Sequence, residues 1–320
     1  MRLVFSLRIV FVLLATGVLV LPSAGCGAKK KGKKGSGLTI KQQLDKAEAE
    51  SSPDRKAAAY AKVARSQLAS SDKTGAKVSV GKAFKEVSGE GDANLFSPRL
   101  VDLAELFVAV GDKKQARKSL ELATTLATDH GKIEDPIRRA KILAEAGAVY
   151  GEKTKGLNDS KLAKEWLEKA AVEADAAEAR FRAEALAAVA MGYTKAGLGK
   201  DASGMVGKLE EAARALDEPR AKAEAFAAAA NVQAQTGNKD EAIALLAEAS
   251  TAAKSVERSE SRAYALLAVA VASSTVGDNK QAISLLKEAD KAADKVADPE
   301  TQKTVVDKVR SMMAEIEKKK

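Results

Sequence analysis

The sequence has few of the residues on which most catalytic and metal centres depend. Its 320 residues include one histidine, one cysteine and one tryptophan, and aromatic residues make up only 4% of the chain. A single cysteine cannot form an internal disulfide, and His130 has no second histidine or free cysteine to complete a zinc site. No Gly-x-Ser-x-Gly elbow or glycine-rich phosphate loop follows a strand-like segment. We therefore expect no cofactor and no metal site, and we expect that the protein is not an enzyme.

Strand-like patterns are also scarce, and the apolar composition favours helices instead. Alternating runs of β-branched and aromatic residues are missing. Apolar residues nevertheless make up 46% of the chain, and most of them are alanine, leucine and valine. Alanine has the highest helix propensity and allows backbones to approach closely. The composition therefore predicts closely packed helices.

The excess of positive charge is confined to the N-terminus. The net charge is +9, but without Arg2, Arg8 and the five lysines of 29–34 the chain has 46 basic and 44 acidic residues. Binding to nucleic acid needs basic residues clustered on one face, usually with stacking aromatic residues. The mixed charges of the remaining chain therefore predict no nucleic-acid partner.

The first 26 residues have the features of an export signal. A basic start is followed by a largely apolar run at 9–21 and by small residues that end at Cys26. Thirteen helical residues span about 20 Å, which is less than the ~30 Å hydrocarbon core of a membrane. The segment resembles a bacterial lipoprotein signal, in which the cysteine receives diacylglycerol and becomes the new N-terminus. Ordinary signal cleavage with an incidental cysteine and an uncleaved signal anchor are the alternatives.

This resemblance implies an exported protein that is anchored to a membrane of the cell envelope through lipid on Cys26. Residues 1–25 would be the signal peptide. Residues 26–52 would be the attachment cysteine and a flexible tether, because 29–37 contains only lysine, glycine and serine. The mature protein would lie on the periplasmic side or at the outer membrane. A soluble secreted or periplasmic protein is the alternative.

The strongest pattern in the sequence is an internal repeat of about 40 residues. Three alanine-rich segments are each followed by a glycine and then by an alanine at fixed spacings. The glycines are Gly197, Gly237 and Gly277, and the alanines are Ala202, Ala242 and Ala282. Gly111 and Gly151 continue the spacing upstream, before a polar insertion at 153–160. A weaker copy starts near Pro53 and turns near Gly75, so the copies should stack in a row.

Each copy predicts two helices joined by a tight turn. The first helix should begin at a Ser, Asp or Glu next to a proline, because proline fits the first helical position. Such starts are Ser52-Pro53, Ser97-Pro98, Asp135-Pro136, Asp217-Glu218-Pro219 and Asp298-Pro299. The helix should end at the repeat glycine, which tolerates a left-handed conformation. The second helix has apolar residues at three- and four-residue steps, as in 281–289.

This pattern resembles the tetratricopeptide repeat, in its longer variants of about 40 residues. The resemblance covers about residues 53–298. Three features carry the resemblance. They are a small residue inside the first helix, a turn glycine followed by a polar residue, and a small residue early in the second helix. In the last two copies these are Ala230 and Ala270, Gly237 and Gly277, and Ala242 and Ala282. It implies an all-α fold, an α-solenoid of about six helix–turn–helix repeats, with a C-terminal capping helix at 299–320.

The first helices of such a stack line its concave side. If the register of the tetratricopeptide family holds, eight residues face this groove. They are Glu184, Met191, Glu224, Asn231, Gln235, Tyr264, Val271 and Ser274. The set mixes apolar and polar residues without a dominant charge, and it implies a protein or peptide partner.

These features together predict a membrane-tethered, non-catalytic scaffold of the cell envelope that binds other proteins. Two alternatives stay open. The architecture also resembles accessory lipoproteins that assemble or secrete envelope and outer-membrane proteins. An enzyme that uses surface carboxylates is the third possibility, although the carboxylates fall mostly beside lysine and arginine, as in a solvated helix face.

Overall fold

A computed structural model describes residues 38–317, which form fourteen α-helices and no strand. The helices are α1 (Ile40–Ala49), α2 (Pro53–Ala69), α3 (Lys73–Val87), α4 (Ala93–Ala109), α5 (Lys113–Thr128), α6 (Pro136–Gly151), α7 (Ser160–Asp175), α8 (Ala179–Lys195), α9 (Gly199–Arg214), α10 (Pro219–Thr236), α11 (Lys239–Ser255), α12 (Ser259–Val276), α13 (Asn279–Ala293) and α14 (Pro299–Glu317). The prediction of an all-α fold is confirmed.

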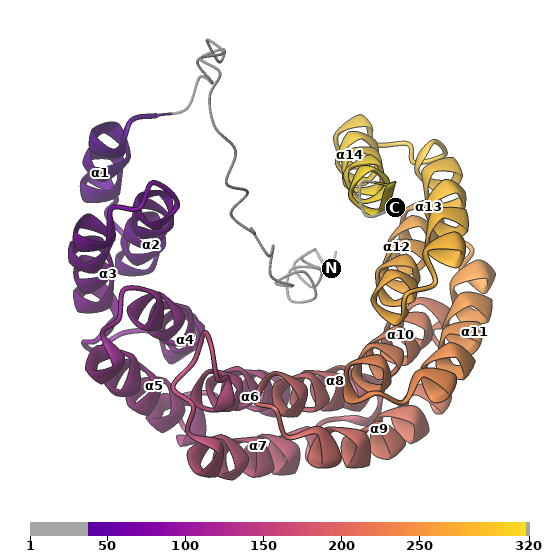
Figure 1. The fold of residues 1–320 in the computed structure, drawn as a ribbon, viewed down its shortest axis with the longest axis horizontal. Coiled ribbons are helices and arrows are strands. Elements are labelled where there is room, and N and C mark those ends of the chain that lie inside the picture. The colour runs from indigo at the N-terminus through magenta and orange to yellow at the C-terminus, as the bar shows by residue number, and fades with distance from the viewer. Residues whose placement is uncertain (1–37, 318–320) are drawn as a thin grey trace, which may run out of the picture. The chain divides into compact units, whose positions relative to one another are not determined.

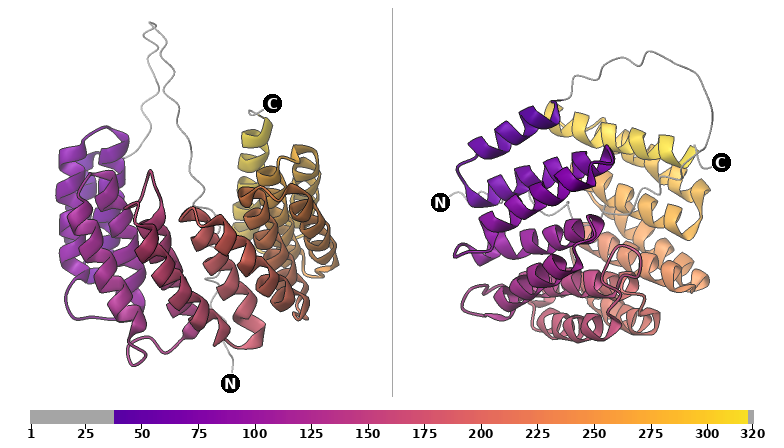
Figure 2. Two further views of the ribbon diagram at one scale, coloured as in Figure 1. Left: turned by 60° about the horizontal axis from the view of Figure 1, so that its bottom comes forward. Right: turned by 60° about the vertical axis from the view of Figure 1, so that its left-hand side comes forward.

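The helices of the 38–317 unit pack as a curved row of six hairpins, from α2–α3 to α12–α13 (Figure 1). The even-numbered helices form the inner layer of the curve, and the odd-numbered helices form the outer layer. Each inner helix also contacts the next inner helix along the row. The views in Figure 2 show the same stack from two other sides. The predicted α-solenoid of about six hairpins is therefore confirmed, with α1 before the first hairpin and α14 after the last.

A residue in the left-handed conformation lies in each turn between the two helices of a hairpin. These residues and their φ angles are Ser71 (65°), Gly111 (83°), Asn158 (56°), Gly197 (75°), Gly237 (94°) and Gly277 (92°). Four of the outer helices then begin at an aspartate whose side chain accepts a hydrogen bond from the backbone N–H three residues later. These aspartates are Asp72, Asp112, Asp159 and Asp278. Such caps stabilise a helix by about 1 kcal/mol each.

Small residues allow the inner helices to approach closely. A Cβ atom added to Gly192 on α8 would lie 2.9 Å from the carbonyl oxygen of Ala144 on α6. On α10, the run of alanines at 227–230 is buried along its whole length. Larger leucines such as Leu167 and Leu246 fill the space between the layers. The core thus uses alanine where helices cross and leucine where the layers meet, as its composition predicts.

Ion pairs connect neighbouring outer helices on the outer side of the curve. The pairs are Glu48–Lys82, Lys77–Asp112, Arg117–Asp159, Lys164–Asp201, Asp175–Lys208, Arg214–Glu248 and Lys254–Glu288. The hydrogen bond from Lys77 and the backbone N–H of Gln115 lower the pKa of Asp112. Such exposed pairs are individually weak, and their regular placement links each hairpin to the next.

The first two hairpins differ from the sequence prediction. The first turn lies at Ser71 and not at Gly75, which is inside α3 and donates its backbone N–H to the cap Asp72. The helix expected to start at Ser97-Pro98 begins earlier, at Ala93, with Pro98 inside it. Asp92 caps this longer helix by accepting from the N–H of Asn94, and the extra turn buries Ala93 and Phe96. Burial of these apolar side chains favours the longer helix.

Gly151 has a different role from the other repeat glycines. It is helical and buried at the end of α6, whereas Asn158 has the left-handed conformation in the following loop. A Cβ atom at Gly151 would lie 2.5 Å from the Cβ of Ala196. Close packing therefore requires glycine at position 151, and the prediction of a left-handed turn there was wrong.

The part of the proposed tether that the structure describes contains a helix. Thr39 caps α1 by accepting from the N–H of Gln42, whose side chain accepts in return from the N–H of Thr39. α1 packs on α2 and buries Ala47. The sequence prediction missed this helix. The predicted signal peptide, Cys26 and the lysines of 29–34 lie outside the described residues. Among the residues that are described, no helix is both long and apolar enough to cross a membrane.

Candidate functional site

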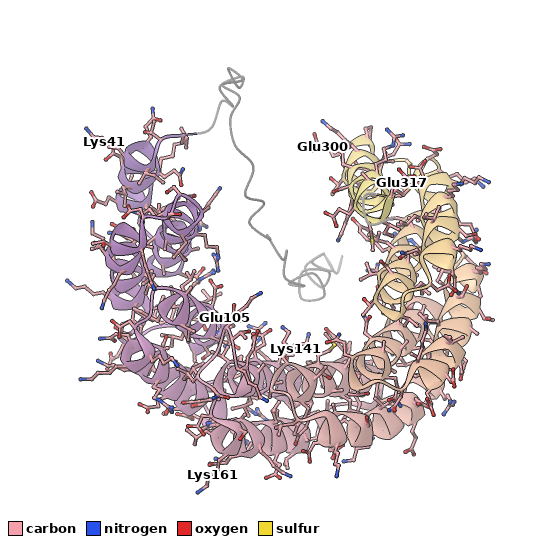
Figure 3. All side chains as sticks on the ribbon, viewed as in Figure 1. Lys41, Glu105, Lys141, Lys161, Glu300 and Glu317 are labelled. Carbon is pink, nitrogen blue, oxygen red and sulfur yellow. The ribbon has the colours of Figure 1, made fainter. Side chains whose placement is uncertain are left out.

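The inner helices repeat one register position along the curve. This position lies six residues before Ser71 or before the repeat glycine of each copy. From α2 to α12 it is occupied by Arg65, Glu105, Glu145, Met191, Asn231 and Val271. Figure 3 shows Glu105 and Lys141 on the concave side of the curve, and Lys161 of the outer layer on the opposite side. At this position the concave surface is therefore charged on α2, α4 and α6 and uncharged on α8, α10 and α12.

All eight groove residues predicted from the sequence lie on the inner helices α8, α10 and α12. Glu184 on α8 pairs with Lys141 on α6, which places it on the same concave surface. Met191 and Val271 are partly exposed, and Gln235 is exposed. The hydroxyl of Ser274 lies 3.5 Å from the side-chain oxygen of Asn279 at the start of α13, so it sits at the hairpin turn.

Glu224 and Tyr264 are brought together by a residue that the sequence analysis did not identify. Arg220 on α10 donates a 2.8 Å hydrogen bond to Glu224 one turn later. The same guanidinium lies 5.3 Å from the ring centre of Tyr264 on α12. A cation over an aromatic face is favourable. This stack joins two neighbouring repeats.

Asn231, on the inner helix α10, is a buried polar residue. Its exposed fraction is 8%, and its Oδ1 atom has no hydrogen-bond partner among the described residues. Leaving a buried acceptor unpaired costs about 1–3 kcal/mol. The equivalent positions in the neighbouring repeats are occupied by the apolar residues Met191 and Val271.

The charged end of the concave surface holds carboxylates in an environment that partly excludes water. Arg65 on α2 pairs with Asp102 on α4. Glu145 on α6 is half-buried, and burial raises its pKa to about 6, with Lys195 opposing the shift and Glu105 adding to it. Loss of hydration also raises the pKa of Glu105. These two carboxylates form no ion pair within residues 38–317, although Lys195 lies close enough to both of them to oppose the rise in their pKa.

The sequence analysis did not assign the charged residues of α2, α4 and α6 to this surface. The missed residues are Arg65, Asp102, Glu105, Lys141, Glu145 and Lys195. Counting six residues back from Gly111 and Gly151 would have found Glu105 and Glu145. Arg65 could not be found in that way, because the prediction placed the first turn at Gly75.

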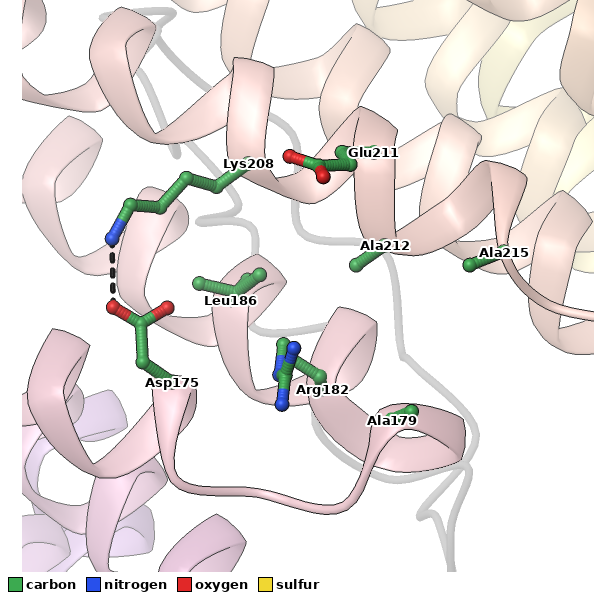
Figure 4. Close-up of a pocket in the computed structure, with 8 residues that line it drawn as sticks. All are labelled: Asp175, Ala179, Arg182, Leu186, Lys208, Glu211, Ala212 and Ala215. Carbon is green, nitrogen blue, oxygen red and sulfur yellow. Dashed lines mark hydrogen bonds and ion pairs between the residues drawn. The ribbon is translucent and has the colours of Figure 1, made fainter.

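Separate from the concave surface, a hollow lies between successive hairpins. It has a volume of about 250 Å³ and is lined by Leu186, Ala179, Ala212 and charged residues at its edge (Figure 4). Lys208 donates a 2.7 Å hydrogen bond to Asp175 across it, and Arg182 binds the carbonyl oxygen of Ala177. The equivalent hollow lies one repeat later, around Phe226 and Ala252. Because the hollow recurs one repeat later between the next pair of hairpins, it is best described as a joint between hairpins.

The described residues offer little for catalysis. No three histidine, cysteine, aspartate or glutamate side chains between residues 38 and 317 are grouped so that they could hold a metal ion. His130, at the exit of α5, is exposed, and its Nε2 lies 3.2 Å from a carboxylate oxygen of Glu173. Glu173 is mostly buried and also accepts hydrogen bonds from Arg139, so it is part of an ion-pair cluster at the surface. The concave surface is the stronger candidate site.

Comparison with protein-family models and with curated proteins finds no match to this chain. Similar folds occur among solved structures. Ton1535 from Thermococcus onnurineus NA1 is 16% identical, with 84% of this chain and 83% of that chain covered and a TM-score of 0.34. A Rap protein complexed with competence and sporulation factor is 14% identical, with 85% and 80% covered and a TM-score of 0.37. Acl4, an assembly chaperone of RpL4, is 15% identical, with 88% and 99% covered and a TM-score of 0.36. These low values leave the function of this chain to be argued from its own residues.

Proposed function

We propose that this protein is a non-catalytic, tetratricopeptide-like scaffold that holds a protein or peptide partner on the concave surface of its inner helices. The observation that carries the proposal is the concave surface of the inner helices, which presents the Arg220–Tyr264 stack and the partly exposed Met191 and Val271. Met191 and Val271 can contact apolar side chains of a peptide. Large aromatic and arginine side chains are also the residues that contribute most at protein interfaces.

The proposal includes attachment to a membrane of the cell envelope through Cys26. It is supported by the basic start, the short apolar run and the small residues before the only cysteine. Two or more acyl chains would hold the protein stably at a membrane. Mass spectrometry of the N-terminal peptide tests this part separately. A mass that includes diacylglycerol on Cys26 supports the anchor, and an unmodified cysteine would refute it.

The groove is tested by removing its central polar and aromatic side chains together. The double variant Asn231→Ala, Tyr264→Ala should capture its partner about 30-fold less well, which corresponds to ~2 kcal/mol at a hot spot. Circular dichroism should show unchanged helical content, because alanine favours helix. The matched control replaces two exposed apolar residues of the outer helices, Val172→Ala and Ile243→Ala, and should bind normally. Undiminished capture by the groove variant would rule out this surface.

A further inference from the structure

Helix α9 contains glycines that its packing does not require. Gly204 and Gly207 lie inside the helix, both are exposed, and nothing lies within 4 Å of a Cβ atom built on either residue. By contrast, a Cβ atom on Gly147 or Gly192 would lie less than 3 Å from Leu167. Glycine in a helix is less favourable than alanine by a factor of about four per residue. The two positions therefore weaken α9 about 20-fold without any gain in packing.

The start of α9 is also less well stabilised than the starts of related outer helices. Leu198 occupies the N-cap position and cannot accept a hydrogen bond there. The outer helices α3, α5, α7 and α13 all have a capping aspartate at this position. A missing cap weakens a helix by a further factor of about five. Among the outer helices, α9 is thus the one that combines glycines not required by packing with a start that lacks a side-chain cap.

The contact from α9 to the start of the next outer helix is weak as well. At this joint, the side-chain nitrogen of Asn238 lies 3.4 Å from the hydroxyl of Ser203. At the corresponding joint between α3 and α5, Lys77 pairs with the capping Asp112 at 2.9 Å. A long contact between neutral groups is weaker than a short charge-assisted hydrogen bond. This end of α9 is therefore joined to α11 less strongly than its other end, where Arg214 pairs with Glu248.

We infer that α9 is a hinge that opens locally before the rest of the helical unit. The combined factors predict that α9 opens about 100 times more often than the capped α7. Relative to α11, which also lacks a side-chain cap, the glycines alone predict about 20 times more frequent opening. α9 packs on both α8 and α10, and α8 also packs directly on α6 and α10. When α9 opens, the inner helices stay connected, and the parts of the unit on either side can pivot about α8. The concave surface can then change its curvature around a partner, a property that does not depend on which partner binds.

Hydrogen exchange of the purified full-length chain tests local opening. The backbone amides of α9 should exchange about 100-fold faster than those of α7 and about 20-fold faster than those of α11. The double variant Gly204→Ala, Gly207→Ala should slow exchange in α9 about 20-fold and leave α11 unchanged. The matched control is Gly81→Ala in α3, where nothing lies within 4 Å of a Cβ atom either; it should slow exchange in α3 alone. Equal protection of α9 and its neighbours, or no response to the double variant, would overturn the inference.

A distance measurement tests the pivot itself. Spin labels are attached at Lys114→Cys on α5 and at Lys287→Cys on α13, in a Cys26→Ser background. They report the distance between the parts of the helical unit on either side of α9. The distance distribution should be broad, and the double glycine variant should narrow it. An equally narrow distribution in both proteins would show that α9 is not a hinge.

Discussion

Replacing Glu145 with glutamine should stabilise the protein at neutral pH. The pKa of Glu145 rises from 4.5 to about 6 because the concave surface removes water from its carboxyl group. One pKa unit corresponds to 1.36 kcal/mol, so the ionised side chain destabilises the folded state by at most about 2 kcal/mol at pH 7. The side chain is only half-buried, and water reduces this effect. We expect Glu145→Gln to raise the free energy of unfolding by about 1–2 kcal/mol at pH 7.

The pH dependence of this gain follows from the direction of the shift. Since the folded pKa lies above the unfolded value, the unfolded chain loses its proton first, and stability falls as the pH rises between about 4.5 and 6. Below this range Glu145 is protonated in both states, so its burial carries no charge penalty. The advantage of Glu145→Gln should therefore be largest at pH 7 and nearly absent at pH 4.

Urea denaturation of both proteins at pH 7 and pH 4 measures the difference. The control is Glu165→Gln, because Glu165 is half exposed on the outer helix α7 and pairs with Lys169 one turn later. This control should lower stability at pH 7 by less than about 0.5 kcal/mol. The reasoning would be refuted if Glu145→Gln destabilised the protein at pH 7, or if its gain were the same at both pH values.

Two further substitutions test the packing of the stack by thermal denaturation. Gly192→Ala should destabilise the protein by about 1–3 kcal/mol, because its Cβ atom would lie 2.9 Å from the carbonyl oxygen of Ala144; an unchanged Tm would contradict the close crossing of α6 and α8. Arg139→Ala should cost about 3 kcal/mol, because this buried guanidinium binds two backbone carbonyl oxygens at 2.7 Å and Glu173. The exposed variant Arg180→Ala should cost less than about 0.5 kcal/mol, and an equal effect of the two would contradict the assigned role of Arg139.

The hairpins could be predicted because the features that define them are local. A glycine with a left-handed backbone follows each alanine-rich segment at a 40-residue spacing, as at Gly237 and Gly277. The first turn could not be recognised in this way, because Ser71 has the left-handed conformation that glycine usually provides. Gly151 matched the spacing for another reason, since it is needed for contact with Ala196. One residue type thus served two physical purposes, and the sequence does not distinguish them.

The candidate surface was only partly predictable, because its charged end is assembled from distant residues. Lys141 and Glu184 are 43 positions apart in the sequence and meet only when α6 and α8 pack together. Arg220 was missed because its pairing with Glu224 resembles an ordinary pair on a solvated helix face. Only the packing of α12 shows that Tyr264 lies beneath it.

Site-specific photocrosslinking in intact cells tests most directly whether partners bind the concave surface. A photoreactive residue would replace Met191 or Val271 on the inner helices, and Val172 or Ile243 on the outer helices in the matched controls. We expect the same partner to be crosslinked from both inner positions and from neither outer position. Crosslinks from the outer positions alone, or equally from both layers, would contradict the account.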